Sequence, residues 1–179
     1  MKNNIVTIFK PKIGNKFRTQ REIEYQSLSR TIEHFKSSAD TEKLSEMMFE
    51  HWRKPPIFPE SKKFMETCPI PVYIVSNIDK EDILEAVRFK GIKSANIFTS
   101  EDAHSYKPRK ELFEYALRSV GIEPGQVVHI GDSLESDVKG ARSAGINAVW
   151  VNRRHRDVPE NVTSVVSLSE ILGIILNKM

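Results

Sequence analysis

The chain has 179 residues, of which 39% are hydrophobic and 28% charged, a composition that excludes disordered and collagen-like proteins. Its formal net charge of +3 is too small to indicate a polyanionic partner, so we expect no binding to nucleic acid. No apolar run approaches the roughly 18 residues that span a bilayer, and the single cysteine excludes an internal disulfide and a cysteine-based zinc cluster. We expect a cytoplasmic enzyme or binding domain, with one main domain and a small appendage.

The first 57 residues predict a strand candidate and two helices. The strand candidate is Ile5-Val6-Thr7-Ile8-Phe9. Apolar residues then recur every three or four positions, which predicts two helices within residues 19–54. The expected apolar faces are Tyr25, Leu28, Ile32 and Phe35 in the first helix, and Leu44, Met47, Met48 and Trp52 in the second. Asp40 or Thr41 is expected to cap the second helix, and Pro55-Pro56 to end it.

After Pro59 the sequence alternates between short apolar runs and amphipathic segments. We expect strands at 71–75, 96–99, 126–130, 147–151 and 162–166, and helices at 79–90, 110–120, 134–144 and 168–177. Strands that alternate with helices form parallel sheets with helices on both faces. The sequence therefore predicts an α/β fold with a three-layer parallel sheet in residues 58–179, preceded by a small helical module in residues 1–57.

Polar residues follow the first predicted strand of this sheet. Ser76 and Asn77 come directly after residues 71–75, and Asp79 is placed to cap the next helix. Ligands of parallel sheets bind beyond the carboxyl ends of the strands, where free backbone N–H groups favour an anion. Ser76 and Asn77 therefore suit an anion-binding site, and the alternative is a turn closed by their side chains.

A second polar group is Tyr106-Lys107-Pro108. We expect Pro108 in the first turn of the following helix, because a proline there loses no hydrogen bond. This position would fix where Lys107 leaves the backbone, and its ammonium could hold a phosphate as a point charge. The alternative is an ordinary surface lysine.

A third polar group contains two carboxylates. Asp132 follows the strand at 126–130, and Asp137 lies in the first turn of the next helix. Helical side chains lean toward the helix N-terminus, so we expect Asp137 to tilt back toward Asp132. Carboxylates that converge repel each other unless a cation lies between them, and Mg²⁺ prefers such hard oxygen ligands. The alternative is an N-cap Asp132 with a solvent-facing Asp137.

Together the three groups supply a hydroxyl with backbone donors, a lysine and two acids that could bind a metal. This combination is typical of phosphoryl transfer, which needs an anion-binding cradle, a cation and a metal. The five histidines show no metal-binding spacing. His129, on a buried strand, is predicted to be a core residue.

These residues resemble motifs of the haloacid dehalogenase-like (HAD) hydrolase superfamily. Ser76-Asn77 looks like its second motif, Lys107-Pro108 like its third, and the run from Gly131 to Asp137 like its fourth, the acidic metal motif. The resemblance spans residues 58–153. It implies a HAD-like, Rossmann-type core in residues 58–179, with residues 19–54 as part of the helical cap that the family inserts after its first motif.

The resemblance also implies a role for each residue. Ser76 and Asn77 would bind the transferring phosphoryl group, and Lys107 would neutralise the phosphate and the nucleophile. Asp132 would ligate Mg²⁺, and Asp137 would support either the metal or Lys107. In this family an aspartate attacks the substrate, and water then hydrolyses the acyl-phosphate intermediate. The implied substrate is a small phosphorylated metabolite, without a membrane partner, and the oligomeric state stays open.

The family's first motif, an apolar strand followed by Asp-x-Asp, does not occur in this sequence. Asp40 is the first aspartate of the chain, and it lies inside the predicted cap. If residues 5–9 form the first strand, Lys10 stands where the nucleophile belongs, and a lysine cannot form an acyl phosphate. Since the first strand is central in this fold, its loss would leave unpaired strand edges.

Three hypotheses follow. The chain derives from a Mg²⁺-dependent phosphatase and is truncated, naturally or by a wrong start site; or it is a pseudoenzyme that binds a phosphorylated ligand or a protein; or it is a 2-haloacid dehalogenase-type hydrolase. The phosphatase fits best, because the arrangement of Asp132 and Asp137 suits a metal that dehalogenases do not need. Phe113 also stands where we expect a tyrosine in the dehalogenase branch.

Overall fold

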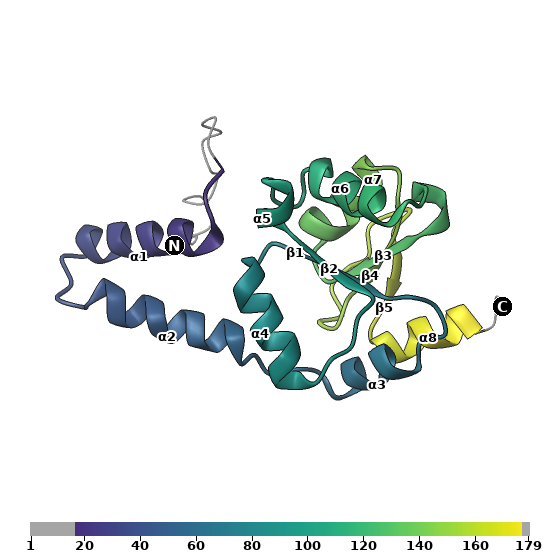
Figure 1. Ribbon diagram of the computed structural model, residues 1–179, viewed down its shortest axis with the longest axis horizontal. Helices are drawn as coiled ribbons and strands as arrows, with labels where there is room; N and C mark the ends of the chain where they lie inside the picture. Colours follow the sequence, from purple (N-terminus) through teal and green to yellow (C-terminus); the bar gives the residue numbers. More distant parts are fainter. Residues whose placement is uncertain (1–16, 177–179) are drawn as a thin grey trace.

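The computed structural model describes residues 17–176, so the strand candidate at residues 5–9 lies outside the described residues. Two helices, α1 (Gln20–His34) and α2 (Thr41–Arg53), form a hairpin that extends away from the rest of the chain (Figure 1). Both were predicted. Thr19 caps α1 in a capping box with Glu22, and Asp40 caps α2 by accepting hydrogen bonds from two backbone N–H groups.

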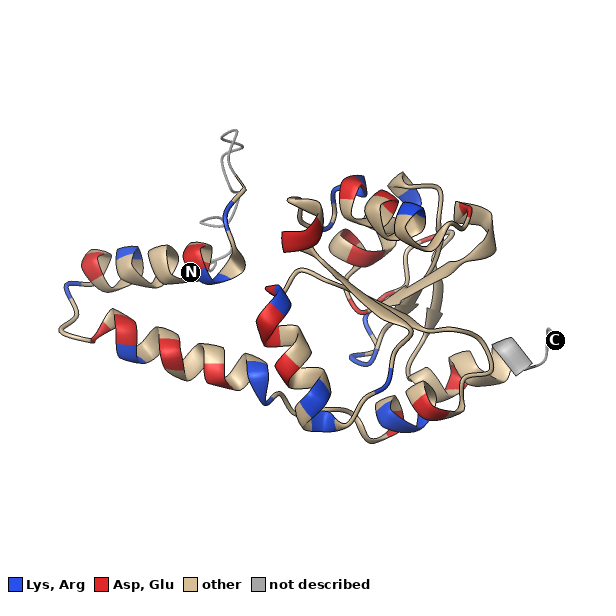
Figure 2. Ribbon diagram, viewed as in Figure 1, with Lys and Arg blue, Asp and Glu red and all other residues tan. Residues whose placement is uncertain are grey.

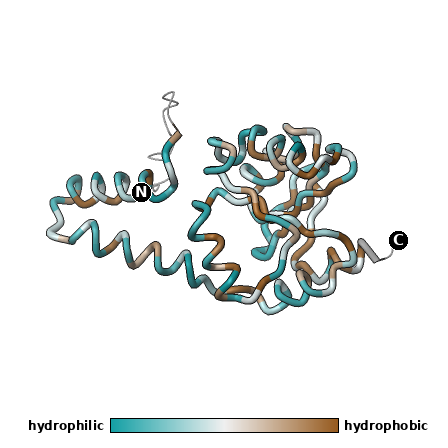
Figure 3. Tube along the Cα trace, in the orientation of Figure 1, coloured by the Kyte–Doolittle hydropathy of each residue, from teal (hydrophilic) through white to brown (hydrophobic). Residues whose placement is uncertain are grey.

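The predicted apolar face of α2 is right only in part, since Met48 and Trp52 are partly buried while the other two residues are not. The buried residues of α2 are Ser45 and Phe49, whereas Leu44 and Met47 are exposed, and α1 buries no residue at all. Figure 2 shows acidic and basic residues along both helices, and Figure 3 shows the hairpin to be more hydrophilic than the strands. Ion pairs between the hairpin and α4, described below, accompany this packing.

The remaining elements alternate between helices and strands, as predicted. They are α3 (Pro59–Thr67), β1 (Tyr73–Ser76), α4 (Lys80–Lys90), β2 (Asn96–Thr99), α5 (Ser100–Ala103), α6 (Lys110–Val120), β3 (Val128–Gly131), α7 (Gly140–Ser143), β4 (Asn147–Val151), β5 (Thr163–Val165) and α8 (Leu168–Leu176). A 3-10 turn (Pro124–Gln126) precedes β3, and a π-helix (Leu134–Lys139) follows it. The sequence analysis missed α3, because it interpreted Pro59 as extending a break although proline at the first turn can begin a helix.

All paired strands are parallel, which confirms the α/β class. They form two separate sheets, one of β1 and β2 and the other of β3, β4 and β5. Within residues 17–176, β1 pairs only with β2 and β3 pairs with β4, so the predicted single sheet is divided between β1 and β3. Every residue of β1 is only partly buried, although its apolar sequence predicted burial on both faces.

Apolar packing covers the two faces of the strands (Figure 1). One cluster joins Phe113 of α6 and Ala141 of α7 to Trp150 of β4, and all three side chains are essentially inaccessible to solvent. The other joins Phe64 of α3 and Ile171 of α8 to β4 and β5. The three layers therefore form as predicted, while the division into domains at residues 57 and 58 stays a prediction. Across the described residues, no helix combines the length and apolar character needed to cross a membrane.

Candidate functional site

Lys107 and Asp137 form a buried ion pair at the carboxyl ends of the strands. Lys107 Nζ donates hydrogen bonds to Asp137 Oδ1 at 2.7 Å and to the carbonyl oxygen of Val75 in β1 at 2.9 Å. The two side chains are only 12% and 7% exposed. Lys107 is therefore not a surface lysine, and its ammonium links β1 to the segment that follows β3.

A π-helix places Asp137 at this site. The predicted α-helix at 134–144 begins instead with the π-helical segment 134–139, in which the Ser133 carbonyl accepts from the N–H groups of both Asp137 and Val138. Ser133, not Asp132, caps this segment. The Asp137 carboxylate lies so close to Gly131 that a Cβ there would be 2.2 Å from its Cγ, so only glycine at position 131 admits it. Single-turn π segments of this kind occur frequently at functional sites.

Charge and hydrogen bonds keep Asp137 ionised. Burial by itself would raise the pKa of Asp137, but a hydrogen bond from His129, the charge and hydrogen bond of Lys107, and the Ser133 N–H outweigh it. Together they hold the pKa of the Asp137 carboxyl well below its usual range. Both carboxylate oxygens are occupied, since Oδ1 faces Lys107 and His129 and Oδ2 accepts the Ser133 N–H at 3.0 Å.

This lowered pKa makes a prediction about acid stability. A carboxyl group with a depressed folded-state pKa stabilises the fold above its unfolded value of about 3.9, and the contribution is lost as the pH falls through the folded-state pKa. The wild type should therefore exceed Asp137→Asn in unfolding free energy at pH 5 to 7, with the difference shrinking at pH 3 and below. Urea titrations of both proteins at pH 7, 5 and 3 measure this difference in unfolding free energy. A difference that stays constant with pH would show that ionisation of Asp137 does not contribute to stability.

Asn77 joins the first predicted polar group to Lys107 of the second. Its side-chain amide donates to the Lys107 carbonyl at 3.2 Å and accepts from the Lys107 N–H at 2.8 Å, so it fixes the backbone from which the lysine extends. Ser76 Oγ accepts the Ile78 N–H at 3.1 Å, and its hydroxyl hydrogen is donated to no other residue of segment 17–176. Pro108 is not in the first turn of α6 as predicted, because that helix begins at Lys110 with Arg109 as N-cap, and the Lys107–Pro108 peptide is cis.

Asp132 differs from Asp137 in having an exposed side chain. No hydrogen bond or ion pair joins its carboxylate to another residue of segment 17–176, while its carbonyl accepts from the Trp150 indole at 3.0 Å and from Arg156 at 3.4 Å. The described residues contain no cluster of three His, Cys, Asp or Glu that could enclose a metal ion. Asp132 therefore offers a single available carboxylate, which suits an ion that takes its other oxygens from phosphate and water, as Mg²⁺ does.

The sequence analysis missed the role of His129. It predicted a core residue, but the structure places Nε2 of this histidine 3.0 Å from Asp137 Oδ1. The sequence does carry a signal, because His129 and Gly131 are two positions apart on β3 and therefore lie on the same face. Asp137 packs against that face at Gly131, so the histidine lies beside it.

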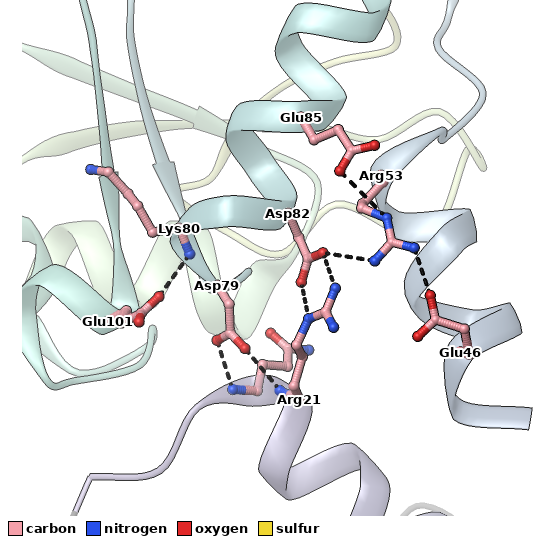
Figure 4. Close-up of polar contacts among 9 residues, drawn as sticks. Arg21, Glu46, Arg53, Asp79, Lys80, Asp82, Glu85 and Glu101 are labelled. Carbon is pink, nitrogen blue, oxygen red and sulfur yellow. Dashed lines mark hydrogen bonds and ion pairs between the residues drawn. The ribbon is translucent and has the colours of Figure 1, made fainter. Parts of the chain in front are cut away.

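The hairpin docks next to the site. Asp79, the predicted cap of α4, is the N-cap by position, but its carboxylate accepts the N–H groups of Gln20 and Arg21 at 2.7 and 2.9 Å (Figure 4). Tyr106, directly before Lys107, donates its hydroxyl to the Arg18 carbonyl at 2.9 Å. The start of the hairpin is thus held by residues close in sequence to Ser76-Asn77 and to Lys107.

Comparison with known proteins gives matches among the HAD-like hydrolases. Residues 105–163 match a family model described as HAD-hydrolase-like. The chain is 36% identical over 73 residues to the pyrimidine 5'-nucleotidase YjjG of Escherichia coli, covering 40% of this chain and 32% of that protein. It is 31% identical over 117 residues to the phosphoserine phosphatase of Thermus thermophilus, covering 62% of this chain and 46% of that protein. The chain thus spans between a third and a half of the length of these curated relatives.

Solved structures share the fold. The magnesium-bound HAD-hydrolase YfnB of Bacillus subtilis superposes with a TM-score of 0.77 at 24% identity, over 89% of this chain and 73% of that one. A dehalogenase superposes with a TM-score of 0.78 at 20% identity, over 89% and 74% of the two chains. These matches confirm the predicted HAD-like fold, and among relatives with similar sequences are hydrolases named as phosphatases.

Proposed function

We propose that this chain, which resembles the HAD-like hydrolases in motifs, sequence and fold, carries the phosphate-binding part of a Mg²⁺-dependent phosphatase that acts on a small phosphorylated metabolite. The observation that carries the proposal is the buried contact of Lys107 with Asp137 and with the Val75 carbonyl. A lysine held in this way presents a fixed positive charge at the carboxyl ends of the strands, where an incoming phosphate would be bound.

Each residue has a role that its contacts support. The free hydroxyl hydrogen of Ser76 would be donated to a phosphoryl oxygen, and Lys107 would neutralise the phosphate charge. Asn77 would keep Lys107 in place through its two hydrogen bonds to the lysine backbone. Asp137 would hold the Lys107 ammonium, because both of its oxygens already have partners among the described residues.

Asp132 would hold Mg²⁺, as the one acid of this site whose carboxylate has no partner within residues 17–176. When bound, the ion would supply positive charge that stabilises the developing negative charge on the transferring group. Asp132 would bind the ion directly, while Lys107 and Ser76 would orient the phosphate toward it. The Trp150 indole and Arg156, which both contact the Asp132 carbonyl, would fix the backbone of this ligand.

A binding protein without hydrolytic activity is the second candidate. The reaction of the family that this chain resembles needs an Asp-x-Asp motif after an apolar strand, and these 179 residues contain no Asp-x-Asp. The remaining residues would still bind a phosphorylated ligand, because none of them depends on the nucleophile for its position. Dehalogenase activity stays a third hypothesis, which needs the same aspartate.

Hydrolysis of an aryl phosphate tests whether these 179 residues act as an enzyme by themselves. We predict that residues 1–179 turn over p-nitrophenyl phosphate with Mg²⁺ no faster than the Asp132→Asn variant does, because the sequence lacks the Asp-x-Asp motif that would supply the nucleophile. The assay compares the two proteins at equal concentration, with a buffer blank. Turnover by the wild type that Asp132→Asn abolishes would contradict the prediction and would mean that another nucleophile serves.

A further inference from the structure

We propose that His129 is a positioning residue, which holds the Asp137 carboxylate in the one orientation that fixes the Lys107 ammonium. The proposal rests on the proposed function of Lys107 as the phosphate-binding cation. It assigns to the site a residue that lies on a strand and does not itself approach the phosphate.

The first support is geometric. His129 Nε2 lies 3.0 Å from Asp137 Oδ1, the same oxygen that accepts from Lys107 Nζ at 2.7 Å. An ionised carboxylate can only accept hydrogen bonds, so Nε2 must carry a hydrogen and donate it. Asp137 Oδ1 therefore receives two donors, one from β3 and one from the segment that precedes α6, and Oδ2 is held by the Ser133 N–H.

The second support is packing, which leaves His129 little choice of orientation. Its side chain is 14% exposed, and its ring meets that of Phe113 edge-on with 5.0 Å between centroids. Phe113 is itself 1% exposed in the core beneath α6. A ring held in this way is preorganised, so the hydrogen bond to Asp137 costs little further entropy.

The third support is the arrangement of β3. Because His129 and Gly131 share a face of the strand, the glycine admits the Asp137 carboxylate and the histidine bounds it on one side. Without the histidine, the carboxylate would keep the Ser133 N–H but could rotate Oδ1 away from Lys107. The lysine would then be held by the Val75 carbonyl alone.

Two variants separate positioning from packing. His129→Phe keeps a ring against Phe113 but removes the donor, whereas His129→Gln keeps an N–H donor and removes the ring. The readout is the rate at which an amine-acylating reagent modifies Lys107, measured by peptide mass spectrometry, with the exposed Lys139 as internal reference. This readout needs neither Mg²⁺ nor phosphate, so it stands even if the proposed function fails.

We expect Lys107 in His129→Phe to react about tenfold faster than in the wild type, because a hydrogen bond to a charged group has been lost. His129→Gln should stay within about threefold of the wild type. Equal rates in the two variants, or a faster reaction in His129→Gln, would overturn the proposal. Circular dichroism checks that both variants fold. If His129→Phe does not fold, His129→Met takes its place, because methionine also lacks a hydrogen-bond donor.

A second measurement connects the histidine to binding. If wild-type protein binds inorganic phosphate in the presence of Mg²⁺ by calorimetry, His129→Phe should bind it about tenfold more weakly and His129→Gln nearly as well. Unchanged binding in His129→Phe would count against the positioning role. Absence of binding in the wild type would instead contradict the proposed function, and the labelling experiment would still decide on His129.

Discussion

Replacing Lys107 with methionine is expected to lower the free energy of unfolding by about 3 kcal/mol at neutral pH, since removing one member of a buried ion pair leaves the other charge buried without a partner. Asp137 would remain ionised and 7% exposed, with only His129 and the Ser133 N–H as partners. The Val75 carbonyl would also lose its donor. Urea denaturation of the purified variant measures the loss.

A second substitution tests the reason for this loss. The double variant Lys107→Met with Asp137→Asn removes the unpaired charge, so it should be more stable than Lys107→Met alone. Lys139→Met is the matched control, because Lys139 and its partner Glu135 are 71% and 66% exposed and such pairs contribute little. If the double variant were less stable than Lys107→Met, the buried ion pair would not be the source of the effect.

Replacing Asp82 with alanine is expected to destabilise the protein by about 2 to 3 kcal/mol and to release the hairpin from the core. Asp82 is inaccessible to solvent, and its carboxylate accepts from Arg21 Nε at 2.7 Å and Nη2 at 2.5 Å, with Arg53 at 3.8 Å (Figure 4). One carboxylate of α4 thus contacts both helices of the hairpin. The expected loss is below that for a fully buried pair because Arg21 is 36% exposed.

Release of the hairpin has its own measurement. Backbone amides of α1 should exchange with deuterium faster in Asp82→Ala than in the wild type, while those of β3 and β4 should be less affected. Glu50→Ala, which removes an exposed partner of Lys54 on α2, is the control and should leave exchange in α1 unchanged. Unchanged exchange in Asp82→Ala would show that apolar contacts of α2, and not the ion pairs, hold the hairpin.

Much of the fold could be predicted from the sequence, since its signals are local. Residues 96–99, 110–120 and 147–151 have their predicted bounds, because each segment combines strong periodicity with clear end signals. The π-helix at 134–139 could not be predicted, because it depends on the fit of the Asp137 carboxylate against Gly131, a contact between β3 and the segment after it. The sequence analysis expected unpaired strand edges if the first strand were lost, and it gave no other reason for the sheet to divide between β1 and β3.

The candidate site was predicted in part. Strand ends correctly indicated Ser76, Asn77, Lys107 and Asp137 as neighbours, because the carboxyl ends of parallel strands meet at one edge. The pairing of Asp137 with Lys107 was one of two roles that the resemblance implied, whereas the residue pattern alone directed Asp137 toward Asp132. His129 was missed because its strand is apolar, and apolar surroundings suggest a packing role.

The most direct test of the proposed phosphate site is thermal unfolding with Mg²⁺ and inorganic phosphate together. A ligand that binds only the folded state stabilises it, so at about ten times its Kd the pair should raise the Tm of the wild type by about 3 to 5 °C. Asp132→Asn, which alters an exposed side chain, should melt like the wild type without ligand and show no such rise. A wild-type Tm that is unchanged at millimolar Mg²⁺ and phosphate, or an equal rise in Asp132→Asn, would contradict the account.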